Sequence, residues 1–592
     1  MAASGEPEKP AMKIGPEEPR MEWRLLLAFL LTGLVMFLAP YLYYKIYGPP
    51  KPTVQPSSTP DAKVPAAPAP GPAPGPALGK ATAATAKPRA PIAAAGTEEF
   101  TLETDLYRVR FSNRGAVVLS WELKKYKDAA SKTLELVNTA AAPKAGHPFS
   151  LSFKDRRPTV DVNHALFVSR PAADGLGVDY EFSDGQVWVR KSYRFERSRY
   201  LWRFLSEAAD ASGPLAHLLL WRGGFGDPAV SNPAAHERTL YYEAASGKLI
   251  TQEAKAAKNG PLTVTGSFVF AGIQDTYFAA VFLPRQGEAL EVQTLSDTVA
   301  SESDPKEAAH VGLGVGGGGR NEFAVFVGPK DLDVLRQVDG RLEQVVDFGT
   351  WFGFIAKPLF LILKWVHHNI VANYGWAIVL VTVFINFALL PLKFTSLKSM
   401  KKMQALQPQI AAINEKYKGI SLRDPRKQQQ NQELMELYKK HGVNPMGGCL
   451  PMLLQIPFFI GFYNVLTVAI ELRGASWLWV TDLSQPEHLP IRILPLAMIV
   501  SQFVMQKMTP ATTADPTQQR MMLLMPLLFG FMFYHFSSGL VLYWLTSNLV
   551  GIAQQLLFNK VMPAPAAVQA PPARTGRPAA PAEVRRRKKA GR

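Results

Sequence analysis

The sequence predicts a membrane α-helical protein with six transmembrane helices and an additional all-β domain folded as a sandwich. Long apolar runs lie between residues 350 and 560, and another covers residues 25–47. Between residues 97 and 345 the polarity alternates with a period of two, which is typical of strands. The 592 residues also exceed the length of one ordinary domain. These observations predict a membrane part and a soluble part.

The N-terminal region predicts a membrane anchor followed by a linker. Residues 1–24 are polar and end in Arg20 and Arg24, and residues 25–47 are almost wholly apolar. A cleaved signal peptide would have a shorter apolar core and a small-residue cleavage site, but Pro40 and four tyrosines stand there. An uncleaved signal-anchor helix is therefore expected at 25–47. Residues 48–96 are rich in Ala and Pro, which predicts an extended linker.

The β domain is expected at residues 97–345. Tyr107, Val109 and Phe111 alternate with arginines, and similar stretches recur at 117–123, 187–195, 262–270 and 323–327. Gly314, Gly316 and Gly319 fit G-x-G-x-x-G, but a dinucleotide site needs that loop to open a helix. A strand-like run follows instead. The glycines therefore predict a flexible hairpin.

Five candidate spans follow an apolar segment that carries charge. Residues 349–370 include Lys357, Lys364 and two histidines, so an amphipathic helix in the membrane interface is expected there. The C-terminal core at 371–560 then contains the spans 374–394, 450–470, 491–506, 521–535 and 539–558. Together with the anchor at 25–47, these make six expected transmembrane spans.

Charge predicts the topology. The loop from residue 393 to 440 carries eleven basic residues against four acidic ones, whereas the loop at 471–492 has three acidic residues against two basic ones. The positive-inside rule places the first loop in the cytoplasm and the second outside. Both termini are then cytoplasmic and the β domain is periplasmic. The residues after Asn559 carry eight net positive charges, and the tail at 561–592 is Pro-rich, which predicts a disordered segment that contacts anionic lipids or RNA electrostatically.

The cytoplasmic loop is expected to form a helical hairpin at residues 396–441. Apolar residues recur at spacings of three and four, Pro408 suggests a kink, Asp424 and Pro425 suggest a helix start, and Gly442 suggests a helix end. The residues expected to present the hairpin to a substrate are Met400, Met403, Pro408, Tyr417, Leu437 and Tyr438.

The sequence offers no convincing catalytic set. No H-E-x-x-H motif occurs, and a single cysteine, Cys449, excludes an intramolecular disulfide and a Cys-rich metal site. His535, Ser537 and Ser538 lie in a tight turn between two spans. The middles of the five C-terminal spans contain no Asp, Glu, Lys or Arg, so no charge carrier is evident. We therefore expect neither an enzyme, nor a cofactor, nor a metal.

Polar residues are nevertheless frequent inside the spans. For any one of them, a hydrogen bond between helices is an equally good explanation. For the whole set, a partly hydrated groove is the better hypothesis. Its candidate residues are Thr382, Asn386, Gln455, Tyr463, Ser501, Gln502, Tyr543, Ser547 and Asn548. The fourth span adds to this argument, because its run of thirteen residues at 493–505, which is apolar except for Ser501 and Gln502, reaches roughly 20 Å against about 30 Å of hydrocarbon, which favours local thinning.

Several motifs resemble the YidC-type membrane protein insertases of bacteria with two membranes. These are 373–378 (NYGWAI), Pro391-Leu392, Leu406-Gln407-Pro408, 443–449 (VNPMGGC), 455–457 (QIP), 506–508 (QKM) and 538–543 (SGLVLY) with Ser547-Asn548-Leu549. The resemblance is close from residue 375 to about 560. The anchor, linker and β domain reproduce the layout of the larger family members.

The resemblance implies a function without covalent chemistry. It implies an insertase and chaperone of the bacterial inner membrane that works as a monomer and receives nascent membrane proteins, alone or with the Sec translocon. Five spans would enclose a hydrophilic groove open to the cytoplasm and the lipid. The basic tail would approach the ribosome, and the β domain would resemble the family's supersandwich, which can touch the Sec translocon.

One position departs from the family. Its members commonly carry an arginine four residues after the groove threonine, whereas here Thr382 is followed by Asn386. The resemblance then implies a groove without its fixed positive charge and a weaker dependence on acidic substrate residues. Lys393 at the groove mouth is the other source of charge. Two other functions remain open: a transporter, for which repeats and a midplane ion site would be expected, and a non-catalytic scaffold for cell-envelope assembly.

Overall fold

The computed structural model describes residues 90–128, 132–227, 230, 232–285, 288–300, 306–349, 351–420, 424–443, 450–508 and 516–562. Side chains are described at all of these except 450–454 and 516–523. The expected anchor at 25–47, most of the linker and the basic tail lie outside the described residues, as does Cys449. The described residues up to 508 and from 522 onward belong to one compact unit.

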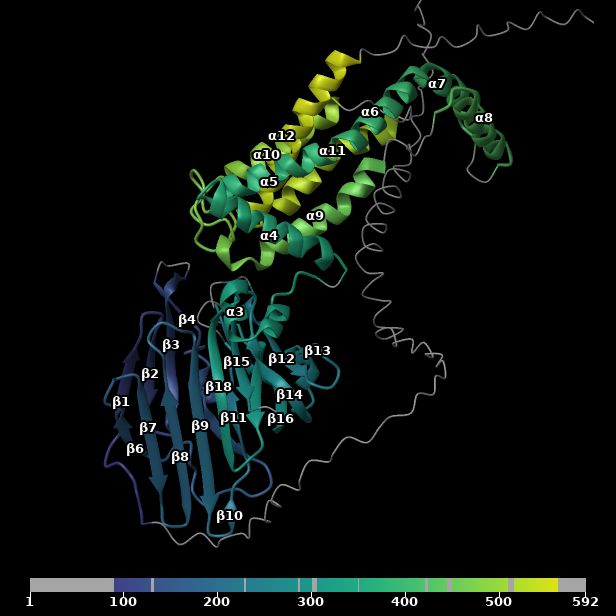
Figure 1. Cartoon of the computed structure of the whole chain (residues 1–592). Helices are drawn as coiled ribbons and strands as arrows, with labels where there is room; N and C mark the ends of the chain where they lie inside the picture. The colour runs from purple at the N-terminus through teal and green to yellow at the C-terminus, as the bar shows by residue number, and fades with distance from the viewer. Residues whose placement is uncertain are drawn as a thin grey trace, which may run out of the picture. The chain divides into compact units, whose positions relative to one another are not determined.

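The first sheet has four antiparallel strands in sequence order (Figure 1). They are β1 (Glu99–Glu103), β2 (Tyr107–Ser112), β3 (Val117–Lys127) and β4 (Thr133–Glu135). Tyr107, Val109 and Phe111 of β2 are fully buried and the arginines between them are exposed, as the alternation predicts. The turn before β3 requires Gly115, because its φ is +72° and a Cβ there would lie 2.3 Å from the Asn163 carbonyl oxygen.

A second sheet contains the other fourteen strands and runs in the order β5-β11-β17-β16-β14-β15-β18-β9-β8-β7-β6, with β10, β12 and β13 paired alongside. The strands are β5 (Ser150–Phe153), β6 (Val168–Pro171), β7 (Gly177–Ser183), β8 (Val187–Arg194), β9 (Leu201–Asp210), β10 (Gly213–Pro214), β11 (His217–Trp221), β12 (Arg238–Glu243), β13 (Lys248–Gln252), β14 (Leu262–Gln274), β15 (Phe278–Pro284), β16 (Ala289–Val299), β17 (Ala308–Gly316) and β18 (Arg320–Pro329). Strand β14 joins the two halves of this sheet, since its first half pairs with β16 and its second half with β15.

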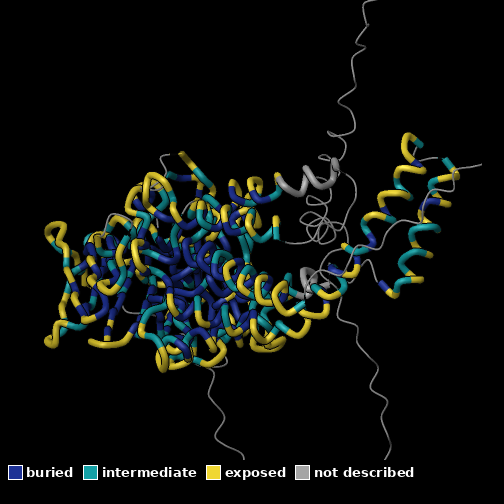
Figure 2. The backbone as a smooth tube through the Cα atoms, turned by 90° about the horizontal axis from the view of Figure 1, so that it is seen from above, coloured by how far each residue is buried: buried dark blue, intermediate teal, exposed yellow. Residues whose placement is uncertain are grey.

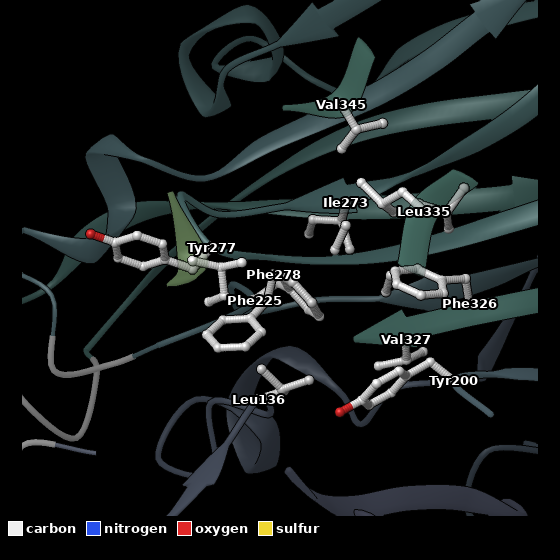
Figure 3. Close-up of a cluster of buried hydrophobic side chains, with 14 of the residues drawn as sticks. Leu136, Tyr200, Phe225, Ile273, Tyr277, Phe278, Phe326, Val327, Leu335 and Val345 are labelled. Atoms are coloured by element: carbon white, nitrogen blue, oxygen red, sulfur yellow. The ribbon is translucent and has the colours of Figure 1, made fainter. Parts of the chain in front are cut away.

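The core of the β domain is aromatic. The Trp121 ring of β3 lies 5.6 Å from Trp202 of β9 and 6.4 Å from Trp221 of β11, and all three are buried. Figure 3 shows another part of this core, where Phe225, Phe278 and Phe326 come together from separate segments. Packing between sheets confirms the predicted all-β sandwich.

The expected hairpin after the G-x-G-x-x-G motif is wrong. Strands β17 and β18 flank these glycines, but β17 pairs with β11 and β16, while β18 pairs with β15 and β9. The segment at 317–319 is therefore a connection between two strands that are not partners. It opens a strand and not a helix, which agrees with the rejection of a dinucleotide site.

Short helices lie between the strands and after the last strand, and an amphipathic helix follows them. The short ones are α2 (Ala142–Ala145), η1 (Pro233–Ala235), η2 (Ala254–Ala257), α3 (Leu332–Val338) and η3 (Gly340–Val345). Helix α4 (Gly353–Asn369) buries Ala356, Leu359, Phe360, Leu363 and Val366 at helical spacing, while Trp365 on its other side is 58% exposed. This two-sided pattern is typical of a helix at a membrane interface.

The remaining helices form the C-terminal part. They are α5 (Tyr374–Ala388), α6 (Leu390–Ala405), α7 (Gln407–Lys416), α8 (Arg426–Lys440), α9 (Leu450–Val468), η5 (Ile470–Leu472), α10 (Ile493–Met508), α11 (Pro516–Phe533) and α12 (Ser538–Val561). Figure 2 shows buried residues in the interior and exposed residues around the outside of the described chain.

Among the described helices, α12 alone is long and apolar enough to cross a membrane unaided. Helices α5 and α6 meet the criterion together but bend by 58° between them, and three shorter apolar stretches lie at 455–468, 493–508 and 524–533. One continuous span was expected at 374–394, but the helix breaks at Leu389. Pro391 explains the break, since it has no amide hydrogen for the Phe387 carbonyl and its ring crowds that carbonyl.

Candidate functional site

Asn386 lies at the centre of a polar cluster between α5, α9 and α12. Its side chain is 3% exposed, and its Nδ2 donates to the Thr382 carbonyl oxygen at 2.9 Å and to Ser547 Oγ at 3.4 Å. Gln455 Nε2 of α9 donates to the same Ser547 oxygen at 3.3 Å. Thr382 is fully buried and donates to the Ile378 carbonyl oxygen. The structure therefore brings four of the sequence-predicted groove residues together.

Lys393 completes this cluster. Its Nζ donates to Asn386 Oδ1 at 2.6 Å and to Gln554 Oε1 of α12 at 3.4 Å, and Gln554 Nε2 donates to the Asn386 carbonyl oxygen at 3.2 Å. Lys393 is the residue that the sequence named as the other source of charge, and its ammonium group lies within hydrogen-bond distance of Asn386. Gln554 is not among the site residues that the sequence predicted. The spacing of seven residues from Ser547 to Gln554, which places both on one face of α12, was the available signal for Gln554.

A second polar group lies on another face of α12. Asn548 Nδ2 donates to Ser501 Oγ of α10 at 3.1 Å, and Ser501 Oγ donates to the Met498 carbonyl oxygen at 2.8 Å. Gln502 Oε1 accepts from Trp544 Nε1 at 3.3 Å. Ser547 and Asn548 are neighbours in sequence, so they point about 100° apart on the helix and serve different neighbours. These contacts hold α10 against α12 and are separate from the Asn386 cluster.

The two tyrosines of the predicted site belong to an aromatic cluster. Tyr543 is 3% exposed and its ring lies 4.8 Å from Phe462 and 6.3 Å from Phe459. Tyr463 lies 6.3 Å from Phe536. Tyr543 precedes Ser547 by one helical turn, so it continues the same face of α12. The predicted set of nine residues thus divides into a polar cluster, an α10–α12 contact and an aromatic end.

The hairpin residues build a small core of their own. Met403, Leu406, Ile410 and Val443 are buried together, with Leu434, Leu437 and Tyr438 packed against them. Tyr417 is 6% exposed and its hydroxyl donates to Glu433 at 2.9 Å. Met400 is half-buried and Pro408 is exposed. Pro408 stands in the first turn of α7, so it begins a helix and does not kink one.

Charged groups link the β domain to the helical part within the larger unit. Lys364 of α4 lies 2.7 Å from Asp333, 3.1 Å from Glu471 and 3.7 Å from Asp331. Burial opposes the charged form of this lysine, yet the hydrogen bond to Asp333 and the nearby carboxylates raise its pKa above the ordinary value. Arg473, after η5, pairs with Asp227, and both side chains are almost wholly buried.

Comparison with known proteins decides the family. A family model described as "YidC periplasmic domain" matches residues 99–362, and one described as "60Kd inner membrane protein" matches residues 365–565. The membrane protein insertase YidC of Syntrophus aciditrophicus is 34% identical over 562 residues, which cover 91% of this chain and all of the relative. The chain belongs to the YidC family of membrane protein insertases.

Two further YidC proteins are similar to this chain. The insertase of a Geobacter species is 36% identical over 489 residues, covering 78% of this chain and 86% of the relative. The crystal structure of an active YidC insertase with its first transmembrane domain resolved is 19% identical, covers 78% of this chain and 93% of that chain, and has a TM-score of 0.33. Family membership confirms what the motifs at 373–378 and 538–543 indicated.

The YidC assignment also limits the chemistry to consider. The family is named for membrane protein insertion, and its described inner-membrane and periplasmic parts divide this chain near residue 362. In the part of the chain that the structure describes, no group of three His, Cys, Asp or Glu residues could hold a metal ion. What the described site offers is hydrogen bonding and one ammonium group.

Proposed function

We propose that this protein inserts newly made proteins into the bacterial inner membrane and helps them fold and assemble, alone or with the Sec translocon. The observation that carries this proposal is the cluster of Asn386, Gln455, Ser547 and Gln554 with Lys393 inside an otherwise apolar helical bundle. Polar groups at such a place are costly unless they are paired or hydrated. They offer partners to a peptide segment that has left water.

The groove lowers the barrier to insertion by hydrogen bonding and by thinning the bilayer. A polar segment that enters hydrocarbon loses its bonds to water, and each unsatisfied group costs roughly 1–3 kcal/mol. Amides and hydroxyls on α5, α9 and α12 replace part of these bonds. Helix α10 has sixteen residues, or about 24 Å, against about 30 Å of hydrocarbon. Its shortness favours a thinner or wetter bilayer beside the groove.

The proposed topology has six spans with both termini in the cytoplasm. The anchor at 25–47 is the first span, and α5, α9, α10, α11 and α12 are the other five. The hairpin of α6, α7 and α8 then lies in the cytoplasm, where eleven basic residues between 393 and 440 support its placement. It would receive the substrate before the groove does. Helix α4 would lie in the periplasmic interface.

The proposed partners follow from charge and location. Nascent membrane proteins are the substrates, and the Sec translocon is a partner for the β domain. The basic residues of the 561–592 tail would bind the ribosome and anionic lipids, with contacts that weaken in salt. The protein would act as a monomer, because the proposed groove is formed by one chain.

Reconstitution tests the proposal. Purified protein in phosphatidylcholine vesicles, without nucleotide or ion gradient, should insert a small one-span substrate, as measured by protease protection of the translocated end. Empty vesicles provide the control. Insertion no greater than in empty vesicles would contradict the function and favour a scaffold for envelope assembly. Insertion that required an ion gradient would favour a transporter-like mechanism.

A further inference from the structure

The loop between η5 and α10 carries an exposed apolar turn at residues 477–480. Trp477 and Val480 exchange both of their backbone hydrogen bonds at 2.8 Å, so Leu478 and Trp479 form a two-residue turn between them. Leu478 is 63% exposed and Trp479 is 42% exposed. Turns that contact only water are usually built from small or polar residues. The exposed pair therefore needs another explanation.

Leu478 stands at a position that favours glycine. Its φ is +49°, in the left-handed region. A two-residue turn with a positive φ at its first central position ordinarily carries glycine there, because a Cβ is strained in that region. Leucine costs free energy in this backbone and gains little from burial in the protein, since most of it is exposed. An apolar medium outside the protein would offset both costs.

Contacts with two helices hold the turn in a fixed place. Trp477 packs so closely on Gly375 of α5 that a Cβ on this glycine would lie 2.2 Å from the indole ring. Trp479 Nε1 donates to Glu487 Oε1 at 2.7 Å, and Glu487 Oε2 accepts from the Leu494 amide of α10 at 2.9 Å. The turn is therefore tied to the first turns of α5 and α10 and cannot fold its apolar side chains inward.

The composition of this surface fits a lipid interface. Trp376 of α5, Trp477 and Trp479 form a row with successive ring centroids 5.5 and 5.9 Å apart, and Trp376 is 45% exposed. Tryptophan concentrates where a membrane meets water, because its ring is apolar and its N–H is polar. The eight residues 474–481 contain no charged side chain. Both helices that hold the turn belong to the part matched by the inner-membrane family model, so phospholipid surrounds them.

We propose that the turn at 477–480 is a lipid-binding wedge, which inserts Leu478 and Trp479 among the phospholipids at one end of the helical part. Leu478 reaches the acyl chains, and the tryptophan rings lie at the level of the headgroups. Because Glu487 joins the turn to α10, the wedge also sets the depth at which this short helix begins. The inference goes beyond the proposed function, since it requires only that the protein lies in a membrane.

Fluorescence quenching measures the insertion of the turn. In a Cys449→Ser background, Leu478→Cys is labelled with bimane, and the full-length protein is placed in phosphatidylcholine nanodiscs that hold one copy each. Reference labels are placed at Leu557, 63% exposed on α12, and at Asn259, an exposed residue of the β domain. Phospholipids with brominated acyl chains should quench the Leu478 label as they quench the Leu557 label. Aqueous iodide should quench it about threefold to tenfold less than the Asn259 label.

Iodide quenching equal at Leu478 and Asn259, or no quenching of the Leu478 label by brominated lipid, would overturn the proposal. The first result would favour a surface that awaits a protein partner. The second, with protection from iodide, would mean that the chain itself covers the turn. A second copy cannot cover it, because each nanodisc holds one.

Leu478→Asn separates a wedge from a turn that is merely strained. Asparagine adopts a positive φ more readily than leucine but is polar. If lipid holds the turn, Leu478→Asn should speed hydrogen exchange of the Val480 amide in nanodiscs about threefold to tenfold, and Leu478→Met should leave it unchanged. Exchange that is unchanged or slower in Leu478→Asn would contradict the wedge. Neither measurement uses a substrate, so insertion yield tests the proposed function separately.

Discussion

His217 is a residue whose three partners fix its protonation. It is 1% exposed in β11, and its Nδ1 lies 2.8 Å from the Leu215 carbonyl oxygen, so this nitrogen carries the hydrogen. Its Nε2 then accepts from Ser206 Oγ at 2.8 Å and from Asn321 Nδ2 at 3.0 Å. Burial lowers the pKa of His217 to about 4. A second proton on Nε2 would face the Asn321 donor.

This arrangement predicts acid sensitivity of the β domain. Because the folded pKa of His217 lies below the unfolded value of about 6.5, its contribution to stability is complete above pH 6.5 and is lost as pH falls toward 4, by roughly 2–3 kcal/mol. His217→Gln should be less stable at pH 7 but should lose less on acidification. Hydrogen-exchange protection of β9 and β11, corrected for intrinsic rates, gives the comparison.

Asp275 titrates in the opposite sense. Burial raises its pKa to about 6, so the folded state takes up a proton that the unfolded state does not between pH 6 and about 3.8, and stability rises there as pH falls. Asp275 is present in both wild type and His217→Gln, so its contribution cancels in the difference between their free energies of unfolding. Equal acid loss in both proteins would contradict the role assigned to His217.

For single residues, the sequence predicted which side chains are buried better than it predicted their hydrogen-bond partners. The period of two identified Tyr107, Val109 and Phe111 as core residues, because alternation determines which face of a strand is covered. The partners of His217 come from Ser206 and Asn321, and no local pattern relates such distant positions. The partners of Lys393 could not be predicted either, because the direction of its side chain depends on the acceptors Asn386 and Gln554 and not on its own position in the sequence.

Among the helices, the hairpin of α6, α7 and α8 is held by few contacts. Leu406, 2% exposed, lies between α6 and α7 at the centre of the small hairpin core. Helix α8 is mostly polar and contributes only partly buried residues to this core. A helix with few buried apolar contacts is expected to have low local stability.

Leu406→Ala should loosen α8 selectively. The substitution removes buried methyl groups from a small core, at a cost of about 2 kcal/mol, the lower end for such changes. Hydrogen exchange of α8 amides should accelerate while α5 and α12 are unchanged. Met435→Ala is the control, because Met435 of α8 is 50% exposed, and it should change the exchange of α8 amides little. Similar acceleration by both variants, or protection unchanged by Leu406→Ala, would contradict the assigned core.

Most helices and some of their ends could be predicted from the sequence, but the break between α5 and α6 could not. Apolar residues at spacings of three and four located α6 to α8, and Gly442 ends α8 with a φ of +57° as its sequence position suggested. The break at Leu389 was missed, because the apolar run continues through it to Phe394. A hydropathy pattern indicates which residues are apolar enough to contact lipid, but it does not indicate where a helix changes direction.

On the scale of the whole molecule, ion pairs connect the β domain to the helices. Arg473 pairs with Asp227 and also donates to the Lys127 carbonyl oxygen, and its guanidinium lies 5.7 Å from the rings of Tyr277 and Phe278. Lys364 contacts Asp331 and Asp333 near α3 but also Glu471 beyond α9. Removal of the β domain would leave the Glu471 contact in place.

A protein without residues 97–345, but with 349–370 retained, should therefore still insert simple substrates. Arg473 would lose its partner Asp227 and would be hydrated, while the ion pair between Lys364 and Glu471 would keep α4 near η5. The measurement is insertion yield in vesicles beside the intact protein. In the truncated protein, Glu471→Gln should reduce the yield further, because it removes the remaining ion pair of α4. Complete loss of insertion by a folded truncated protein would contradict this account.

The overall architecture was predictable in class and not in detail. Alternation and charge gave an all-β domain beside a helical part, but the order of fourteen strands depends on long-range pairing. Strand β14 illustrates this, since its sequence does not reveal that its two halves have different neighbours. Pairing of that kind is decided by packing between layers.

The central claim is that a substrate passes along the polar face of α12 that faces α5 and α9. Photo-crosslinking residues placed singly at Gln455 and Gln554 test it, with Leu549 and Leu557, which are 54% and 63% exposed on α12, as controls. With a ribosome-bound, one-span nascent chain arrested during insertion, Gln455 and Gln554 should crosslink to the substrate strongly and the two leucine positions weakly. Crosslinks equally strong or stronger from Leu549 and Leu557 would contradict the claim.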